Sequence, residues 1–151
     1  MAKVLAFAVA IYVALGVFVF CAQRSMLYFP SVCTAERVDF EAQKFGLKRW
    51  LGPDGKPMGL KQADLGRLAQ GTVMIMYGNG GSAVGCVHYV SDIGYLAGFN
   101  VFILEYPGYQ DRAGRPTEES IFEAADAAFR LLPTNAPIYL VGESLGSGVA
   151  S

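Results

Sequence analysis

The chain has 151 residues, enough for one domain with a modest core, and its formal net charge is −1. The sequence has no basic patch, so charge gives no reason to expect nucleic-acid binding. Hydrophobic residues make up 53% of the chain and charged residues only 17%, which is apolar for a soluble protein.

An apolar segment at the N-terminus accounts for part of that excess. Residues 4–22 include no charged side chain, and at 1.5 Å per residue they reach nearly across a bilayer core of about 30 Å. Phe18, Phe20 and Cys21 stand where a signal-peptide cleavage site would have small residues. An uncleaved signal anchor is therefore favoured over a cleaved signal peptide or a buried helix.

The basic residues around this segment specify its orientation only weakly. Lys3 precedes the anchor, whereas Arg24 and Arg37 follow it, and we expect the domain of residues 23–151 on the non-cytoplasmic side. The segment Met26–Pro30 fits either interfacial aromatics next to a membrane or a first strand that ends at Pro30.

The first part of the domain reads as short strands. Val38–Ala42 alternates apolar and polar residues and predicts a half-buried strand, and Phe45–Leu51 predicts another. Gly52–Pro57 is a turn cluster. Residues 58–70 have no clear pattern and are expected to form a surface excursion.

The second part alternates buried strands with helices. The expected strands are Thr72–Tyr77, Asn100–Leu104 and Ile138–Val141, and the expected helices are Val84–Leu96 and a helix from Thr117 to Leu132. This order predicts an α/β fold with a mostly parallel sheet and helices on both faces.

The third strand runs into Gly142-Glu143-Ser144-Leu145-Gly146. Gly-x-Ser-x-Gly after a buried strand and before a helix is typical of a nucleophile elbow, a sharp turn that presents a serine hydroxyl. Glycines allow the strand and the helix to approach closely. In a chain with eighteen glycines the pattern can arise by chance as a glycine-rich turn, but the apolar run before it favours the elbow.

A second glycine-rich loop, Gly78–Ala83, has two interpretations. With Glu105 at the end of the next strand it matches a dinucleotide-binding fingerprint, which predicts a Rossmann-like oxidoreductase. In a hydrolase the same loop supplies backbone N–H groups to an oxyanion hole, and Glu105 is a strand-end acid that caps a neighbour or pairs with Arg112. The hydrolase interpretation explains both loops and is preferred.

Taken together, these stretches resemble the α/β-hydrolase superfamily, in particular its membrane-anchored branch. The matching stretches are Gln23–Pro30, Tyr77–Gly81, Glu105–Tyr109 with Gly114–Glu118, and Gly142–Gly146. The resemblance implies that Ser144 is the nucleophile and that the oxyanion donors are the backbone N–H groups of Asn79 and Leu145. Tyr77 stands where such enzymes usually have a histidine.

The acid and histidine of a triad should follow the serine in the chain, but none follows Ser144. The single histidine, His88, precedes it and is expected on a helix surface. We therefore expect the N-terminal part of a longer, truncated serine hydrolase that cleaves a small-molecule or peptide ester, thioester or amide. As given, the chain is expected to be inactive.

No cofactor is expected, and no metal, because His, Cys and acidic residues do not cluster with ligand spacing. The three cysteines show no C-x-x-C pair, and whether Cys33 and Cys86 are joined stays open. A non-catalytic, membrane-tethered interaction protein is the remaining alternative.

Overall fold

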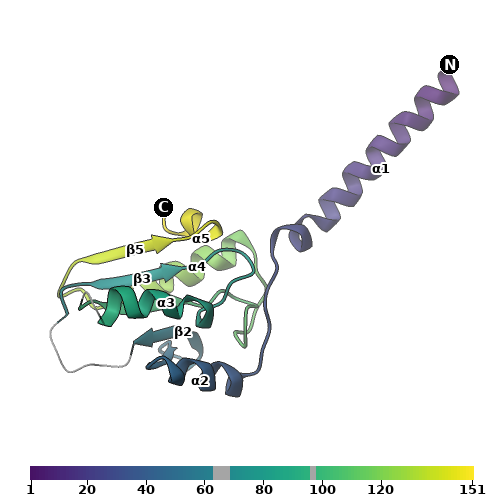
Figure 1. The fold of residues 1–151 in the computed structure, drawn as a ribbon. Helices are drawn as coiled ribbons and strands as arrows, with labels where there is room; N and C mark the ends of the chain where they lie inside the picture. The colour runs from purple at the N-terminus through teal and green to yellow at the C-terminus, as the bar shows by residue number, and fades with distance from the viewer. Residues whose placement is uncertain (63–68, 96–97) are drawn as a thin grey trace.

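The fold is described from a computed structural model, which describes residues 1–62, 69–95 and 98–151. It contains a five-stranded sheet flanked by helices, with a long N-terminal helix that projects away from it (Figure 1). The strands are β1 (Leu47–Leu51), β2 (Pro57–Gln62), β3 (Thr72–Met76), β4 (Asn100–Leu104) and β5 (Ile138–Gly142). The main helices are α1 (Ala2–Leu27), α2 (Ala35–Lys44), α4 (Glu118–Phe129) and α5 (Leu145–Val149).

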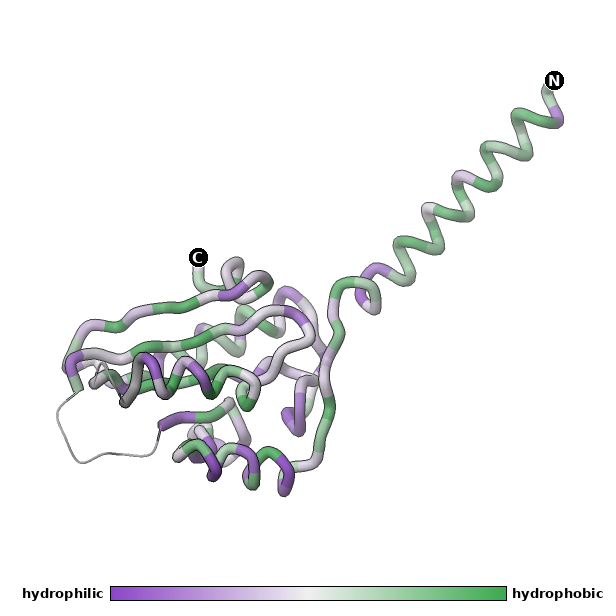
Figure 2. Tube along the Cα trace, viewed as in Figure 1, coloured by the Kyte–Doolittle hydropathy of each residue, from purple (hydrophilic) through white to green (hydrophobic). Residues whose placement is uncertain are grey.

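The N-terminal helix α1 is long and apolar enough to cross a membrane, with a mean hydropathy of 2.8 over its most apolar window. None of its residues is buried against the domain. Figure 2 shows that it is hydrophobic along nearly its whole length. The helix begins before the predicted anchor of residues 4–22 and continues past it to Leu27.

The sheet has the order β1-β2-β4-β3-β5 and is mixed. The two pairs that involve β2 are antiparallel, and β3 is parallel to both β4 and β5. The expectation of a mostly parallel sheet was therefore wrong. The Gly52–Pro57 turn makes β1 and β2 antiparallel, because the chain reverses there with Gly55 at a φ of 75° and returns as β2.

Strand β2 lies in the stretch that was expected to be a surface excursion. Residues 57–62 instead fill the sheet between β1 and β4, while residues 63–68 lie outside the described part of the chain. Gly59 permits this pairing, because a Cβ there would lie 2.0 Å from the carbonyl oxygen of Ile103.

The predicted strand Val38–Ala42 was also wrong, because these residues belong to helix α2. The Thr34 side chain caps the helix by accepting from the Arg37 N–H at 3.4 Å. Val38 and Ala42 are four residues apart and form its buried face, and Phe40 between them is exposed. The apolar alternation was thus one face of a helix plus an exposed aromatic residue.

The remaining elements agree more closely with expectation. β1, β3, β4 and β5 fall within or beside the predicted ranges, and α4 begins after Thr117, which forms a capping box with Ser120. The predicted helix Val84–Leu96 is an irregular helical stretch made of a 3₁₀ turn (Val84–Cys86), α3 (Val87–Tyr89) and a π-helical segment (Val90–Tyr95); Leu96 is not described. Residues 28–30 form no strand.

Candidate active site

Ser144 lies on the turn between β5 and α5, at the carboxyl end of the sheet. Its backbone has φ 50° and ψ −113°, a combination that residues other than glycine rarely adopt. The residue is exposed, and its side chain makes no capping hydrogen bond to α5. The hydroxyl is therefore held by a strained turn and is open to solvent rather than packed in the core.

The two glycines on either side explain how so sharp a turn forms. A Cβ at Gly142 would lie 2.4 Å from the carbonyl oxygen of Gly146, and a Cβ at Gly146 would lie 2.0 Å from that of Met76. Such separations are far inside van der Waals contact. Both positions of the Gly-x-Ser-x-Gly pattern therefore require glycine because α5 packs directly against the ends of β5 and β3.

The glycine-rich loop after β3 lies next to this turn. Met76 of β3 pairs with Gly142 of β5, so the two strands end side by side. The position of a Cβ on Gly78 is 3.3 Å from the Cβ of Ser144. Beyond Gly78 the chain makes a tight turn, closed by a 3.1 Å hydrogen bond from the Gly81 N–H to the Gly78 carbonyl.

The backbone N–H groups of Asn79 and Leu145 belong to these two turns. Asn79 is the second residue of the Gly78–Gly81 turn, and Leu145 is the first residue of α5. Within the described residues, neither N–H group donates a hydrogen bond to another protein atom. An oxyanion hole requires unengaged backbone donors next to the nucleophile, and these two N–H groups are the candidates for it.

The side chain of Asn79 has a role that the sequence did not suggest. Its Oδ1 accepts from the Phe29 N–H and from the Tyr109 hydroxyl, each at 2.9 Å, and its Nδ2 donates to the Leu27 carbonyl. Asn79 thus joins the loop to the chain that leaves α1. A polar residue in a glycine loop was the only signal available in the sequence.

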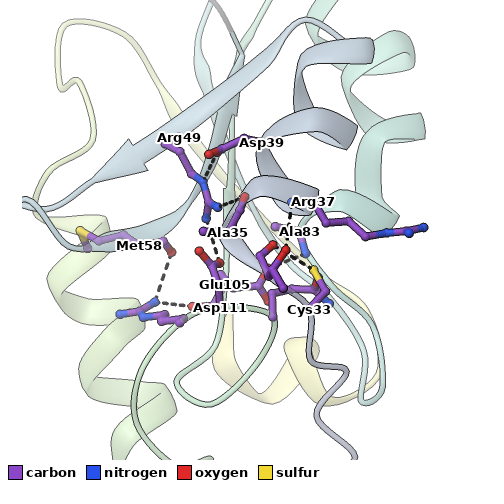
Figure 3. A network of polar contacts seen from close by, with 12 residues as sticks. Cys33, Ala35, Arg37, Asp39, Arg49, Met58, Ala83, Glu105 and Asp111 are labelled. Carbon is purple, nitrogen blue, oxygen red and sulfur yellow. Dashed lines mark hydrogen bonds and ion pairs between the residues drawn. The ribbon is translucent and has the colours of Figure 1, made fainter.

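Beneath the loop, Glu105 is buried with 4% of its surface exposed. One carboxylate oxygen accepts from the Tyr77 hydroxyl, and the other accepts from the Ala83 N–H at 3.1 Å, a contact included in Figure 3. Burial raises the pKa of Glu105 to about 7, against the lowering effect of these hydrogen bonds. The acid therefore supports the loop from below, and Tyr77 takes part in that support.

Arg112 does not pair with the Glu105 carboxylate. Its guanidinium donates instead to the backbone carbonyls of Glu105 and Met58. The expectation that Glu105 caps a neighbour is met at the Ala83 N–H group, at the start of the 84–86 turn. The alternative expectation, that Glu105 pairs with Arg112, was wrong, because Arg112 bonds to the backbone carbonyl of Glu105 and not to its carboxylate.

A second polar network, shown in Figure 3, joins α2, β1 and the loop after β4. Arg49 contacts Asp39 at 2.5 Å and Asp111 at 2.8 Å, and it donates to the Ala35 carbonyl. Cys33 Sγ donates to Gln110 Oε1 at 2.7 Å, and Cys33 and Cys86 are both free thiols. The network fixes the loop of residues 106–112 but includes no elbow residue.

Among the described residues, no histidine or carboxylate side chain hydrogen-bonds to Ser144. His88 is exposed and stacks on Tyr89 with ring centroids 4.1 Å apart, in a hollow that it shares with Lys44 and Phe45. Glu143 is exposed beside Gly78. The seven residues after Ser144 include neither an acid nor a histidine.

The described part of the chain has no group of three His, Cys, Asp or Glu side chains placed to hold a metal ion. No protein-family model matches the chain, and no solved structure matches it significantly.

Proposed function

We propose that this chain carries the nucleophile half of a serine hydrolase that cleaves an ester, a thioester or an amide. Ser144 attacks the substrate carbonyl, and the resulting oxyanion is bound by the N–H groups of Asn79 and Leu145. The observation that carries the proposal is the strained backbone of Ser144 between two glycines that have no room for a Cβ.

The chemistry needs a base that these residues do not provide. A serine hydroxyl is a weak nucleophile until a neighbouring base takes its proton. We propose that a histidine, oriented by an acid, comes from protein outside these 151 residues. The 151-residue chain should accordingly not react stoichiometrically with a fluorophosphonate probe at an ordinary enzyme rate.

A dinucleotide-binding oxidoreductase is less well supported. In that interpretation Glu105 would bind a ribose hydroxyl. Here Glu105 is buried, and both of its carboxylate oxygens already accept hydrogen bonds from the loop and from Tyr77. NAD(P) binding by the unsubstituted chain that is lost in Gly80→Val would favour this alternative.

The membrane association is part of the proposal. Helix α1 has the length and hydropathy of a membrane span, and its residues do not pack on the domain. We propose that it anchors the hydrolase, with the domain on the non-cytoplasmic side. Protection of the domain from added protease in sealed vesicles of known orientation would test the side.

The function is tested with the complete gene product on a p-nitrophenyl ester. Ser144→Ala should lower kcat by at least about 10³-fold. Ser151→Ala is the matched control, because Ser151 is an exposed serine just past α5 whose hydroxyl donates only to the Gly148 carbonyl, at 3.0 Å. Equal activity of the two variants would show that Ser144 is not the nucleophile.

A further inference from the structure

Residues 28–33, called the strap here, connect the end of α1 to α2 and run along the candidate oxyanion loop. Phe29 donates its N–H to Asn79 Oδ1 at 2.9 Å, and Asn79 Nδ2 returns a bond to the Leu27 carbonyl at the last residue of α1. The Asn79 side chain is therefore hydrogen-bonded both to the last residue of α1, Leu27, and to Phe29 of the strap.

A second set of contacts continues along the strap. Ser31 Oγ donates to the Gly81 carbonyl at 3.0 Å. Gln110 donates from its backbone N–H to the Ser31 carbonyl at 2.6 Å and from Nε2 to Ser31 Oγ at 2.7 Å. Tyr28 is buried, with 8% of its surface exposed. The strap is thus a bonded part of the loop and not a loose linker.

The length of α1 places this contact relative to a membrane. Residues 4–22 span most of a hydrocarbon core of about 30 Å, and residues 23–27 add about 7 Å of helix. The headgroup region of each leaflet is about 5–7 Å deep. With α1 across a bilayer and along its normal, Leu27 and the Asn79 side chain bonded to it would therefore lie at the outer edge of the headgroups.

The sheet is oriented to match. The carboxyl ends of β3 and β5 point toward the base of α1 (Figure 1), so both candidate turns are at the end of the domain nearest the helix. Large apolar side chains are exposed around the strap, namely Met26, Leu27, Phe29 and Val32. Apolar residues next to a membrane helix suit contact with lipid.

We propose that the strap holds the oxyanion loop against the end of α1 and keeps the Ser144 turn at the membrane surface, where it takes the acyl ester of a membrane lipid. The substrate class rests on the proposed hydrolase function, whereas the position of the turn does not. Asn79 is then a positioning residue through its side chain, in addition to its candidate backbone donor.

The position is tested by fluorescence quenching in the full chain in lipid vesicles. Cys21→Ser and Cys33→Ser remove the accessible thiols, and one fluorophore is placed on Ser144→Cys or, as control, on Asn135→Cys. Asn135 is exposed and lies before β5, about 16 Å or more along the strand from Ser144. Headgroup nitroxide lipids should quench the label at 144 at least about threefold more. Equal quenching, or stronger quenching at 135, would overturn the proposal.

The proposed role of the strap in holding the oxyanion loop is tested by amide hydrogen exchange in the same vesicles. Asn79→Ala should speed amide exchange at Phe29 and across Gly78–Ser82 by about tenfold, because the variant loses one or two side-chain hydrogen bonds. Asn135→Ala should change nothing there. Ser31→Ala provides a second, smaller variant if Asn79→Ala does not fold. Unchanged exchange in the folded variant would show that the strap does not position the loop.

The substrate is tested with the complete gene product. A long-chain acyl ester in vesicles should be hydrolysed with a kcat/KM at least tenfold above that of a soluble short-chain ester, and Asn79→Ala should lower kcat more than it changes KM. A preference for the soluble ester would refute the lipid substrate. Hydrolysis of neither would refute the proposed function, while quenching and exchange would still decide the position of the turn.

Discussion

The two candidate turns lie at the carboxyl ends of the parallel strands β3 and β5, and they are held in different ways. The Gly78–Gly81 turn depends on side-chain hydrogen bonds to distant parts of the sequence: Asn79 bonds to Phe29, and Glu105 supports the loop at Ala83. The Ser144 turn depends on backbone packing, because Gly142 and Gly146 leave no space for a side chain. One turn is therefore adjustable by side-chain bonds, and the other is fixed by steric exclusion.

The contrast has a consequence for mutations. A methyl group on Gly146 would lie far inside van der Waals distance of the Met76 carbonyl oxygen, so the backbone would have to move to make room for it. Removal of a hydrogen bond at the other turn costs only about 1 kcal/mol, because water replaces part of it. The four substitutions that follow probe the two turns and the Glu105 support, from the largest expected effect to the smallest.

Gly146→Ala should be the most damaging. Its Cβ would lie 2.0 Å from the Met76 carbonyl oxygen, and we expect a loss of at least about 4 kcal/mol in the free energy of unfolding. Gly148→Ala is the matched control on the same helix, since nothing lies within 4 Å of a Cβ there, and it should be neutral or slightly stabilising. Denaturant unfolding in micelles measures both, and similar values for the two would refute steric exclusion at the elbow.

Glu105 makes the stability depend on pH. Its pKa is about 7 in the folded chain against a usual value of 4.5, so the folded state holds the proton more tightly. Its stabilising contribution is present in full below pH 4.5 and is lost as the pH rises through 7, by about 3 kcal/mol. Unfolding curves of Glu105→Gln should lack this decline. A parallel decline in the variant would assign it to other groups.

Ser144→Gly should stabilise the fold. Glycine adopts φ 50° with ψ −113° at little cost, whereas serine is strained there, and we expect a gain of about 1–2 kcal/mol. Ser144→Ala keeps the Cβ and should gain nothing. If thermal unfolding shows no difference between the two, the turn is not strained.

Gly80→Ala should have the smallest effect. Gly80 has a φ of 76°, but the nearest atom to its Cβ would be the Phe29 carbonyl oxygen at 3.9 Å. Only the left-handed backbone is then disfavoured, which costs roughly 1 kcal/mol. If Gly80→Ala lost as much free energy of unfolding as Gly146→Ala, the two turns would not differ in their tolerance of a side chain.

The sequence predicted the parts of the fold whose signals are local. The buried strands β3, β4 and β5 are continuous apolar runs, and the start of α4 is marked by Thr117. The glycine spacing around Ser144 indicated the sharp turn, because the contact that excludes a side chain at Gly142 is made by Gly146, within the same five residues. These features need little information from elsewhere in the chain.

The features that were missed depend on distant partners. Strand β2 has a weak pattern of its own and is defined by pairing on both sides. Helix α2 looked like a strand because exposed Phe40 completed an alternation. The bond between Asn79 and Phe29 joins residues 50 positions apart, and the Glu105 support joins residues 22 apart. No local pattern encodes such contacts.

The reactivity of the Ser144 hydroxyl group tests the assignment of the β5–α5 turn most directly. The complete gene product should be treated with a fluorophosphonate probe, digested and analysed by mass spectrometry for the labelled residue. We predict one label per chain, on Ser144, and none in Ser144→Ala. A product that hydrolyses esters but carries the label on another residue, or is labelled equally in Ser144→Ala, would contradict the assignment of the β5–α5 turn as a nucleophile elbow.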